Sequence, residues 1–436
     1  MKRRHFLGAL TGAAVAPRIS WAGVRVELVA HPVEAQILFD DFPPTPMLGF
    51  NGTTPGPALR VRQGDFLDLL FRNQIKDGSA VHWHGVRSDN AMDGVPGLTQ
   101  DIVEPGAEFA YRLRVPDAGT FWYHSHNRSW EQVAKGLYGP LIVEETSPPD
   151  VDHELIVLID DWRMTEEGAL APGFDNRHDQ AHQGRLGNFA RALIDPDSPV
   201  RRGDRLRLRL INVATDRIFP IDLGGLEGKI VALDGMPLPT PQPITDVVLA
   251  PAQRVDIIAD VTATNRVTFD FPVSDGPYAL GEILVDGENT NRRSGRITAL
   301  PPNRMPTPDL EQMAILQLNM QGGAMSSAMR SQTDIWAFNG QSGLTNIPFH
   351  RFERGQTARI TLMNDTRFAH GIHLHGHHFF ELNDAGDLGA FRDTTLVNPG
   401  EKRDILCVFD NPGKWLLHCH MLGHQAAGMK TWIDVA

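Results

Sequence analysis

The sequence predicts an all-β protein built from three consecutive β-sandwich domains with Greek-key strand order. Short runs of alternating apolar and polar residues are separated by turns rich in the 41 glycines and 31 prolines of the chain. Such runs, with little helical periodicity between them, are typical of antiparallel β-sandwiches. A length of 436 residues leaves room for about three domains, and an internal repeat indicates where each of them lies.

The repeat is clearest in the first and last thirds of the chain. The tripeptide Phe-Asn-Gly occurs at residues 50–52 and again at 338–340, and each copy leads into an alternating strand, at 66–71 and 358–363. A distance of 18 residues connects equivalent glycines and histidines in four cases: Gly64 to His82, Gly355 to His373, Gly106 to His124 and Gly400 to His418. The two units are therefore expected to share one fold and to place their histidines alike.

A middle unit shares the scaffold but lacks the histidines. A turn at 202–204 precedes an alternating strand at 205–211, and Pro-Ile-Asp stands at 220–222, where the outer units have a histidine pair. We expect this domain to be a spacer without metal ligands. The expected domain boundaries are 23–146, 150–302 and 310–436, with proline-containing linkers near 148–149 and 301–308.

Residues 1–22 have the pattern of an export signal. Lys2, Arg3 and Arg4 precede an apolar stretch at 7–16 that is too short to cross a bilayer, and small residues at 20 and 22 fit a signal-peptidase site. The paired arginines, followed by Phe-Leu, are similar to a twin-arginine signal. We therefore expect a mature protein without a membrane span, in the periplasm or secreted.

The composition narrows the range of partners and of cysteine chemistry. The formal net charge is -12 and no long basic run occurs, which argues against a nucleic-acid partner. Cys407 lies in the apolar run 405–409 and is expected to be a buried free thiol. The other cysteine, Cys419, is then available as a metal ligand.

Histidine pairs are the strongest functional signal in the chain. With 18 histidines in 436 residues, chance alone gives about 0.7 His-x-His pairs. The chain has five, and four of them fall at equivalent positions of the repeat: 82/84, 124/126, 373/375, 375/377 and 418/420. Imidazole with thiolate suits copper or zinc, and this many paired histidines exceeds what one tetrahedral zinc can use.

The triplet His418-Cys419-His420 indicates two adjoining metal sites. Successive side chains of a strand face opposite ways, so the two histidines share one face and the cysteine lies on the other. One strand can therefore serve two sites through a short covalent path.

The residues that follow the triplet match the two-His, one-Cys, weak axial Met donors of a blue-copper site. Cys419 is followed by His424 and Met429. His370 is the expected second histidine, because its offset of three from His373 turns it to the opposite face of a strand. An axial methionine favours a lower potential than a non-coordinating side chain, and hence a mild oxidant.

Four histidine-containing motifs, taken in chain order, resemble those of three-domain multicopper oxidases, both laccase-like and cuprous-oxidase-like. The four motifs are HWHG at 82–85, HSH at 124–126, HGIHLHG at 370–376 and the segment 418–429. The resemblance covers essentially the whole mature chain. It implies three cupredoxin-like domains, four copper ions, and the oxidation of a reductant coupled to the reduction of dioxygen to water.

The resemblance also implies a role for each ligand. It assigns the type 1 copper to His370, Cys419, His424 and Met429, the type 2 copper to His82 and His373, and the type 3 pair to His84, His124, His126, His375, His418 and His420. The division of the six type 3 ligands between two coppers stays open. The trinuclear cluster would lie between domains one and three, and Cys419 would carry electrons to it.

Proton supply is the point at which the chain departs from the family pattern. Asp93 is similar to the family's buried acid near the type 2 copper and is the expected proton relay, with an Asp-Gly turn as the alternative interpretation. Residues 421–425 offer no second carboxylate beside the triplet. A second departure is Gly371, which replaces the usual proline after His370.

The reductant is not fixed by the sequence. Phenols, aromatic amines and low-valent metal ions all suit such an oxidase, and a periplasmic cuprous oxidase is the alternative function. Met320, Met325 and Met329 are candidates for an extra Cu(I) site because thioethers select Cu(I), while packing in a core is the competing interpretation. A copper-free scaffold member of the family would have lost ligands, whereas all twelve are present. We expect a monomer.

Overall fold

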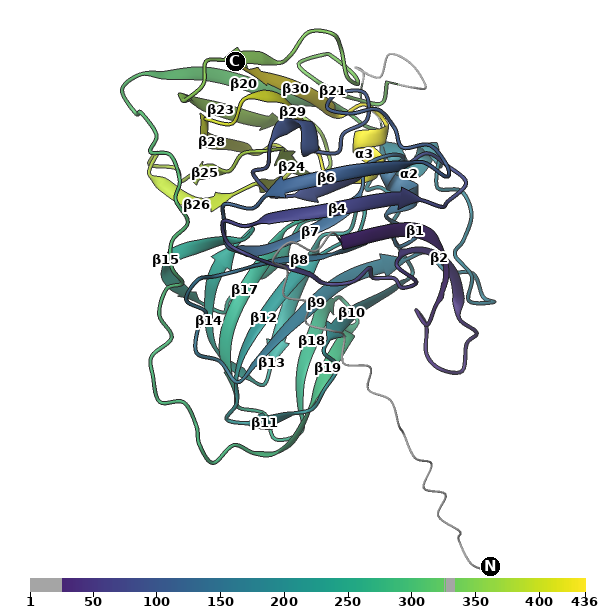
Figure 1. Cartoon of the computed structure of the whole chain (residues 1–436), viewed down its shortest axis with the longest axis vertical. Coiled ribbons are helices and arrows are strands. Elements are labelled where there is room, and N and C mark those ends of the chain that lie inside the picture. The colour runs from purple at the N-terminus through teal and green to yellow at the C-terminus, as the bar shows by residue number, and fades with distance from the viewer. Residues whose placement is uncertain (1–25, 325, 327–333) are drawn as a thin grey trace, which may run out of the picture.

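The computed structural model describes residues 26–324, 326 and 334–436. Six sheets pack in three pairs, and each pair encloses its own hydrophobic core. Figure 1 shows the first unit in purple and blue, the second in teal, and the third in green and yellow. The predicted all-β fold of consecutive sandwiches is confirmed.

The first unit pairs a sheet of order β2-β1-β4-β6 with one of order β3-β8-β7-β5. Its core takes the alternate residues of these strands, so that Leu67 and Leu69 of β4 are buried. The strands are β1 (Val26–Ala35), β2 (Thr45–Phe50), β3 (Leu59–Arg62), β4 (Phe66–Asn73), β5 (Val81–His84), β6 (Glu108–Arg114), β7 (Gly119–Ser125) and β8 (Tyr138–Glu144).

The second unit pairs sheets of order β10-β9-β12-β17-β14-β15 and β11-β19-β18-β13-β16. Its core is aliphatic and includes Leu208 and Ile257 from neighbouring strands. The strands are β9 (His153–Trp162), β10 (Phe189–Asp195), β11 (Val200–Arg202), β12 (Arg205–Asn212), β13 (Phe219–Gly224), β14 (Leu226–Leu233), β15 (Met236–Pro243), β16 (Val247–Leu249), β17 (Arg254–Val261), β18 (Arg266–Val273) and β19 (Gly276–Glu288).

The third unit pairs sheets of order β21-β20-β23-β28-β25-β26 and β22-β30-β29-β24-β27. The strands are β20 (Met313–Gly322), β21 (Trp336–Phe338), β22 (His350–Phe352), β23 (Gln356–Asn364), β24 (His370–Leu374), β25 (Phe379–Leu382), β26 (Leu388–Arg392), β27 (Thr394–Val397), β28 (Lys402–Phe409), β29 (Gly413–Cys419) and β30 (Lys430–Val435). β24 and β29 are neighbours in the second sheet, which brings their histidines together.

Short helices occur where the units meet. They are η1 (Asn90–Met92), α1 (Ser129–Gln132), α2 (Arg177–Ala181) and α3 (Leu422–Ala426). α3 contacts both α1 and α2, so all three units meet around it (Figure 1). Its first turn is held by Asp216 of the second unit, whose carboxylate accepts the Gly423 N–H at 3.0 Å.

Buried arginines join the first and second units. Every residue of β12 is buried, including the arginines on its basic face. Arg207 and Arg209 donate to Asp256 at 2.7 and 3.1 Å, and Arg209 also donates to Thr120 of the first unit at 2.8 Å. The cations remain buried because each is paired with a carboxylate.

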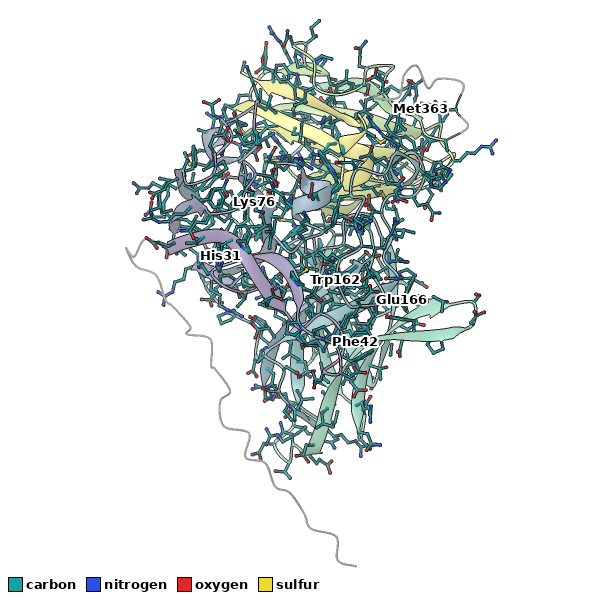
Figure 2. The ribbon with its side chains drawn as sticks, turned by 90° about the vertical axis from the view of Figure 1, so that its right-hand side faces the viewer. His31, Phe42, Lys76, Trp162, Glu166 and Met363 are labelled. Atoms are coloured by element: carbon teal, nitrogen blue, oxygen red, sulfur yellow. The ribbon has the colours of Figure 1, made fainter. Side chains whose placement is uncertain are left out.

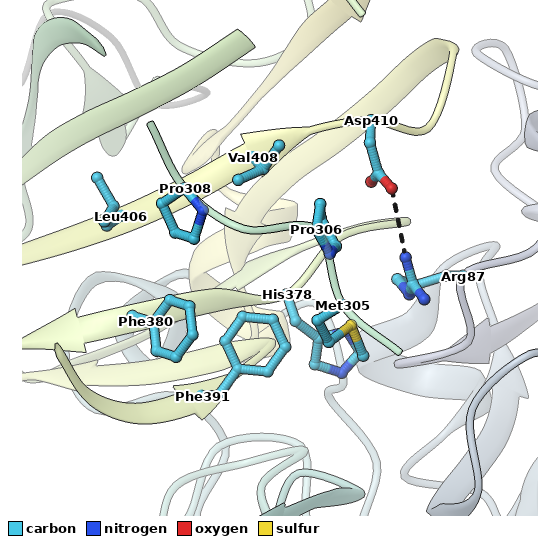
Figure 3. A pocket seen from close by; sticks show the side chains of 10 residues that line it. All are labelled: Arg87, Met305, Pro306, Pro308, His378, Phe380, Phe391, Leu406, Val408 and Asp410. Atoms are coloured by element: carbon cyan, nitrogen blue, oxygen red, sulfur yellow. Dashed lines mark ion pairs between the residues drawn. The ribbon is translucent and has the colours of Figure 1, made fainter. Parts of the chain in front are cut away.

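Two further contacts fix the first unit. Phe42, in the loop between β1 and β2, packs against a small core that includes Trp162 of β9 (Figure 2). The second linker places residues 305–308 beside Phe391 of the third unit, next to an ion pair of 3.6 Å between Arg87 and Asp410 (Figure 3). Among the described residues, none of the helices is long and apolar enough to span a membrane.

Candidate metal centres

Strand register places the predicted histidines opposite one another. His82 of β5 pairs with His124 of β7, and His373 of β24 pairs with His418 of β29. Side chains of directly opposed residues lie on the same face of a sheet. Each outer unit therefore presents a set of histidines at the surface where the two units meet.

Eight predicted histidines come together at this contact in three groups, two of which share His84. Within each group the candidate ligand atoms lie within 4.8 Å of one another. All eight residues are buried. The groups are His82, His84 and His373; His84, His124 and His420; and His126, His375 and His418. Every group draws on both outer units, so neither unit alone can form the site.

Hydrogen bonds at the outer ring nitrogens orient these histidines. His82 Nδ1 donates to the Asp93 carbonyl at 2.7 Å, His124 Nδ1 to the Ser125 carbonyl at 2.9 Å, and His418 Nδ1 to the Cys419 carbonyl at 2.9 Å. In the described part of the chain, the remaining nitrogens of several members have no hydrogen-bond partner: Nε2 of His82, His124, His126 and His373, Nδ1 of His84, and both nitrogens of His420. Buried polar atoms without a partner are costly, and metal ligation accounts for them here.

The site favours the uncharged form of seven of these histidines. Burial lowers the pKa of seven members, and charge repulsion between neighbouring imidazoles lowers it further: His84, His124, His126, His373, His375, His418 and His420. A metal binds the neutral imidazole, so ligation requires no proton to be displaced from these rings near neutral pH.

A second group lies on the opposite face of β29. His370 Nδ1 and His424 Nδ1 are 3.0 Å apart, and they lie 3.6 and 3.7 Å from Cys419 Sγ. The outer nitrogens of both rings are bonded elsewhere, His370 Nε2 to the Thr366 hydroxyl at 2.9 Å and His424 Nε2 to the His182 carbonyl at 2.7 Å. Two imidazole nitrogens and one sulfur therefore converge, the donor set of a blue-copper site.

Two methionines accompany this group. Met429 is buried in the core of the third unit, and its carbonyl accepts the Cys419 N–H at 3.0 Å. Met421 was not expected from the sequence, yet its Sδ lies 3.7 Å from Cys419 Sγ. The signal that could have found it is its position two residues after Cys419, just beyond the end of β29.

The expected proton relay, Asp93, contacts histidines from both outer units. Its Oδ2 accepts from His375 Nδ1 at 2.9 Å, and its Oδ1 lies 3.3 Å from His82 Nδ1. Asp93 is 2% exposed, which is deeper than a simple turn requires. The carboxylate thus lies between two candidate ligands.

A second buried carboxylate, Asp393, also borders the eight histidines and was missed from the sequence. Its Oδ1 lies 3.1 Å from His84 Nε2, and its carbonyl accepts from His373 Nδ1 at 2.9 Å. Arg254 of the second unit donates to its Oδ2 at 2.6 Å. Burial alone would raise the pKa of Asp393, but Arg254 and His84 hold that pKa well below its usual range. These contacts reach His84 and His373 of the eight-histidine group, while residues 421–425 offer no carboxylate beside the triplet, as the sequence indicated.

A pocket of about 220 Å³ lies beside His424. Its walls are partly apolar, with Ile218 and Phe368, and partly polar, with Asp216. Burial raises the pKa of Asp216 to about 6. The pocket is large enough to admit a small aromatic molecule next to one of the imidazoles near Cys419.

The candidate Cu(I) methionines are only partly described. Met320 of β20 is fully buried and belongs to the core of the third unit. Met325 and Met329 lie outside the described residues. For Met320, core packing is the role that the structure displays.

Fold and site together define a protein of the copper-dependent oxidase class. Multicopper oxidase family profiles match residues 33–148, 156–280 and 312–436. The chain is 32% identical to multicopper oxidase MmcO of Mycobacterium tuberculosis, over 89% of this chain and 82% of the relative. It is 25% identical to copper resistance protein A of Pseudomonas syringae pv. tomato, with 88% of each chain covered. The crystal structure of Lac15 from a marine microbial metagenome is 63% identical, with a TM-score of 0.83, and covers 94% of this chain and 100% of that chain.

The chain belongs to the multicopper oxidase family. The family resemblance predicted from the four motifs is therefore confirmed. The protein is an oxidoreductase that uses copper, takes electrons from a reductant and passes them to dioxygen.

Proposed function

We propose that the protein is a laccase-like oxidase that holds four copper ions in two centres. The type 1 copper would be held by His370, Cys419, His424 and Met429. The type 2 copper is assigned to His82 and His373. The grouping of ligand atoms supports dividing the type 3 ligands into His84, His124 and His420 for one copper and His126, His375 and His418 for the other.

The observation that carries this proposal is the position of Cys419 between the two ligand groups. Its side chain lies with His370 and His424, while its chain neighbours His418 and His420 belong to the eight-histidine group. When bound, copper supplies the one-electron redox chemistry and the place where dioxygen is reduced to water. The polypeptide supplies the short covalent link between the centres and shields the ligands of both centres from solvent.

Asp93 is proposed to hold the proton that oxygen reduction consumes. Its carboxylate reaches His375 and His82 directly, so a proton held there lies beside the ligand group that handles dioxygen. Asp393 is less suited to this role, because its ion pair with Arg254 keeps it ionised.

Replacing Asp93 with asparagine is expected to slow reoxidation of the reduced enzyme by oxygen by roughly 10²–10⁴-fold, the usual loss when a positioned acid is removed. Reduction of the type 1 centre should keep its rate. Stopped-flow measurement of the two half-reactions separates these effects. The control is Asp89→Asn, which changes an exposed aspartate in the same segment. Equal slowing of both half-reactions would refute the relay.

The proposed reductant is a small phenol or aromatic amine that docks in the pocket beside His424. The pocket supplies apolar walls and a single buried acid, Asp216. Cuprous oxidation is the second candidate, favoured by the similarity to copper resistance protein A. An aromatic molecule needs the space in this pocket, whereas a single metal ion does not.

Ile218→Trp, which narrows the pocket, is expected to raise KM for a dimethoxyphenol about tenfold, equivalent to about 1.4 kcal/mol. Oxygen uptake with Cu(I) and with ferrocyanide should be unchanged, because neither needs an aromatic site. Copper-loaded wild type and variant are compared by oxygen uptake with all three donors. Wild-type turnover with Cu(I) but not with the phenol would favour the cuprous oxidase instead. The absence of a blue absorption band after copper loading would contradict the proposed assignment of copper to these ligands.

Export by the twin-arginine route to the periplasm is proposed on the pattern of residues 1–22 alone. These residues lie outside the described part of the chain. We also propose a monomer without a nucleic-acid partner, since the formal net charge of -12 includes no long basic run.

A further inference from the structure

A small cavity lies beneath the second linker, on the face of the third unit's first sheet that points away from its core. Phe379 of β25 belongs to that core, so the next residue, Phe380, points the other way and lines the cavity together with Leu406 of β28. Met305 of the linker lies over it (Figure 3). The cavity volume is about 10 Å³, which is room for one water molecule or one metal ion.

His378 is the imidazole that lines this cavity. It is 4% exposed, and among the described residues neither of its ring nitrogens has a hydrogen-bond partner. Its Nε2 lies 3.4 Å from Asp393 Oδ2, but not in the geometry of a hydrogen bond. The ring is held in place by stacking on Phe391, with 5.6 Å between the ring centroids. A buried imidazole with two unpartnered nitrogens indicates a bound group that uses at least one of them.

Met305 adds a thioether sulfur to the same cavity. The linker is fixed two residues earlier, where Asn303 Nδ2 donates to the Ala118 carbonyl at 2.8 Å and Asn303 Oδ1 accepts the Ala118 N–H at 2.9 Å. Arg87 also lines the cavity, but it donates to both carboxylate oxygens of Asp117, at 2.7 and 3.0 Å. Because its charge is compensated by this pair, Arg87 does not exclude a monovalent cation from the cavity.

We propose that His378 and Met305 form a binding site for one Cu(I) ion, which is held there on its way to the eight-histidine group. A thioether with an imidazole is a soft donor pair that selects Cu(I), whereas zinc and magnesium require more ligands. One carboxylate separates this site from the eight-histidine group: Asp393 Oδ2 lies 3.4 Å from His378 Nε2, and its Oδ1 lies 3.1 Å from His84 Nε2. The transfer of the ion rests on the proposed copper assignment, while its binding does not.

The test of binding titrates the copper-loaded enzyme with Ag(I), a redox-inert substitute for Cu(I), and counts bound silver after gel filtration. The wild type should bind one silver ion more than Met305→Leu or His378→Gln, because each variant lacks one of the two donors and should bind at least about tenfold more weakly. Phe380→Leu is the matched control, since it changes the wall of the cavity but keeps both donors, and it should bind silver like the wild type. Equal silver content in the wild type and the two donor variants would overturn the inference.

A second measurement follows the loading of copper-free protein with Cu(I) without oxygen, with samples exposed to air at intervals. In both donor variants the blue band should appear at the wild-type rate, while the EPR signal of the type 2 copper should appear about tenfold more slowly. Equal loading rates of both centres in wild type and variants would also overturn the inference. The blue band reports a folded third unit, so if His378→Gln does not develop it, Met305→Leu in the linker decides both measurements. A wild type that binds silver without ever developing a blue band is a different result, because it contradicts the copper assignment and not the silver site.

Discussion

Cys419→Ser is expected to abolish oxygen uptake with every reductant, a loss of at least about 10³-fold, because serine supplies no thiolate to bind copper or to link the two ligand groups. The blue absorption band should disappear at the same time. The eight-histidine group is unchanged in this variant, so the EPR signal of the type 2 copper should remain. Copper analysis, absorption and EPR on one preparation test all three statements.

Cys407→Ser is the matched control, because Cys407 is also buried and free. Its Sγ donates to the His378 carbonyl at 3.4 Å, a bond that a serine hydroxyl can replace. This variant should keep its blue band and its turnover. Retention of turnover in Cys419→Ser, or loss of the type 2 signal together with the blue band, would contradict the proposed separation of the two centres.

Asp393→Asn should lower the free energy of unfolding by about 3–5 kcal/mol, the usual loss when one partner of a buried ion pair is removed. Asp393 and Arg254 are both fully buried and lie 2.6 Å apart. Asparagine leaves the guanidinium with an uncompensated charge and weakens the hold on His84. Urea denaturation of the copper-free protein measures the effect without the contribution of bound metal.

The double variant Arg254→Met with Asp393→Asn supplies the comparison. Removing both charges relieves the uncompensated cation, so the double variant should be more stable than Asp393→Asn alone. Asp387→Asn, on an exposed turn of the third unit, should change the stability by less than about 0.5 kcal/mol. If Asp393→Asn is no more destabilising than Asp387→Asn, the ion pair does not hold the units together as described.

The parts of the fold and site that follow from local pattern could be predicted from the sequence. Alternation and the repeat predict sandwiches because strand periodicity is a local property. A His-x-His pair predicts convergence because its two side chains must share a strand face. The same argument put Cys419 on the face opposite His418, and the structure places it there with His370 and His424.

What could not be predicted depends on the packing of distant segments. Asp393 contacts Arg254 and His84 only because the three units pack together, and no sequence motif predicts these contacts. The middle unit was expected to be a spacer, yet it supplies Arg254 and the His182 carbonyl that orients His424. These contacts come from tertiary packing, which single-sequence patterns do not encode.

The division of the eight histidines between the first and third units also gives the metal a mechanical part. Ligands such as His82 and His373 are far apart in the sequence, so any ion bound by both closes a very long loop. Closing a loop removes freedom from the unfolded chain, and the cost of doing so grows only slowly with loop length. Bound copper would therefore stabilise the contact between the first and third units. Removing the metal would lower the stability of the fold as well as abolish activity.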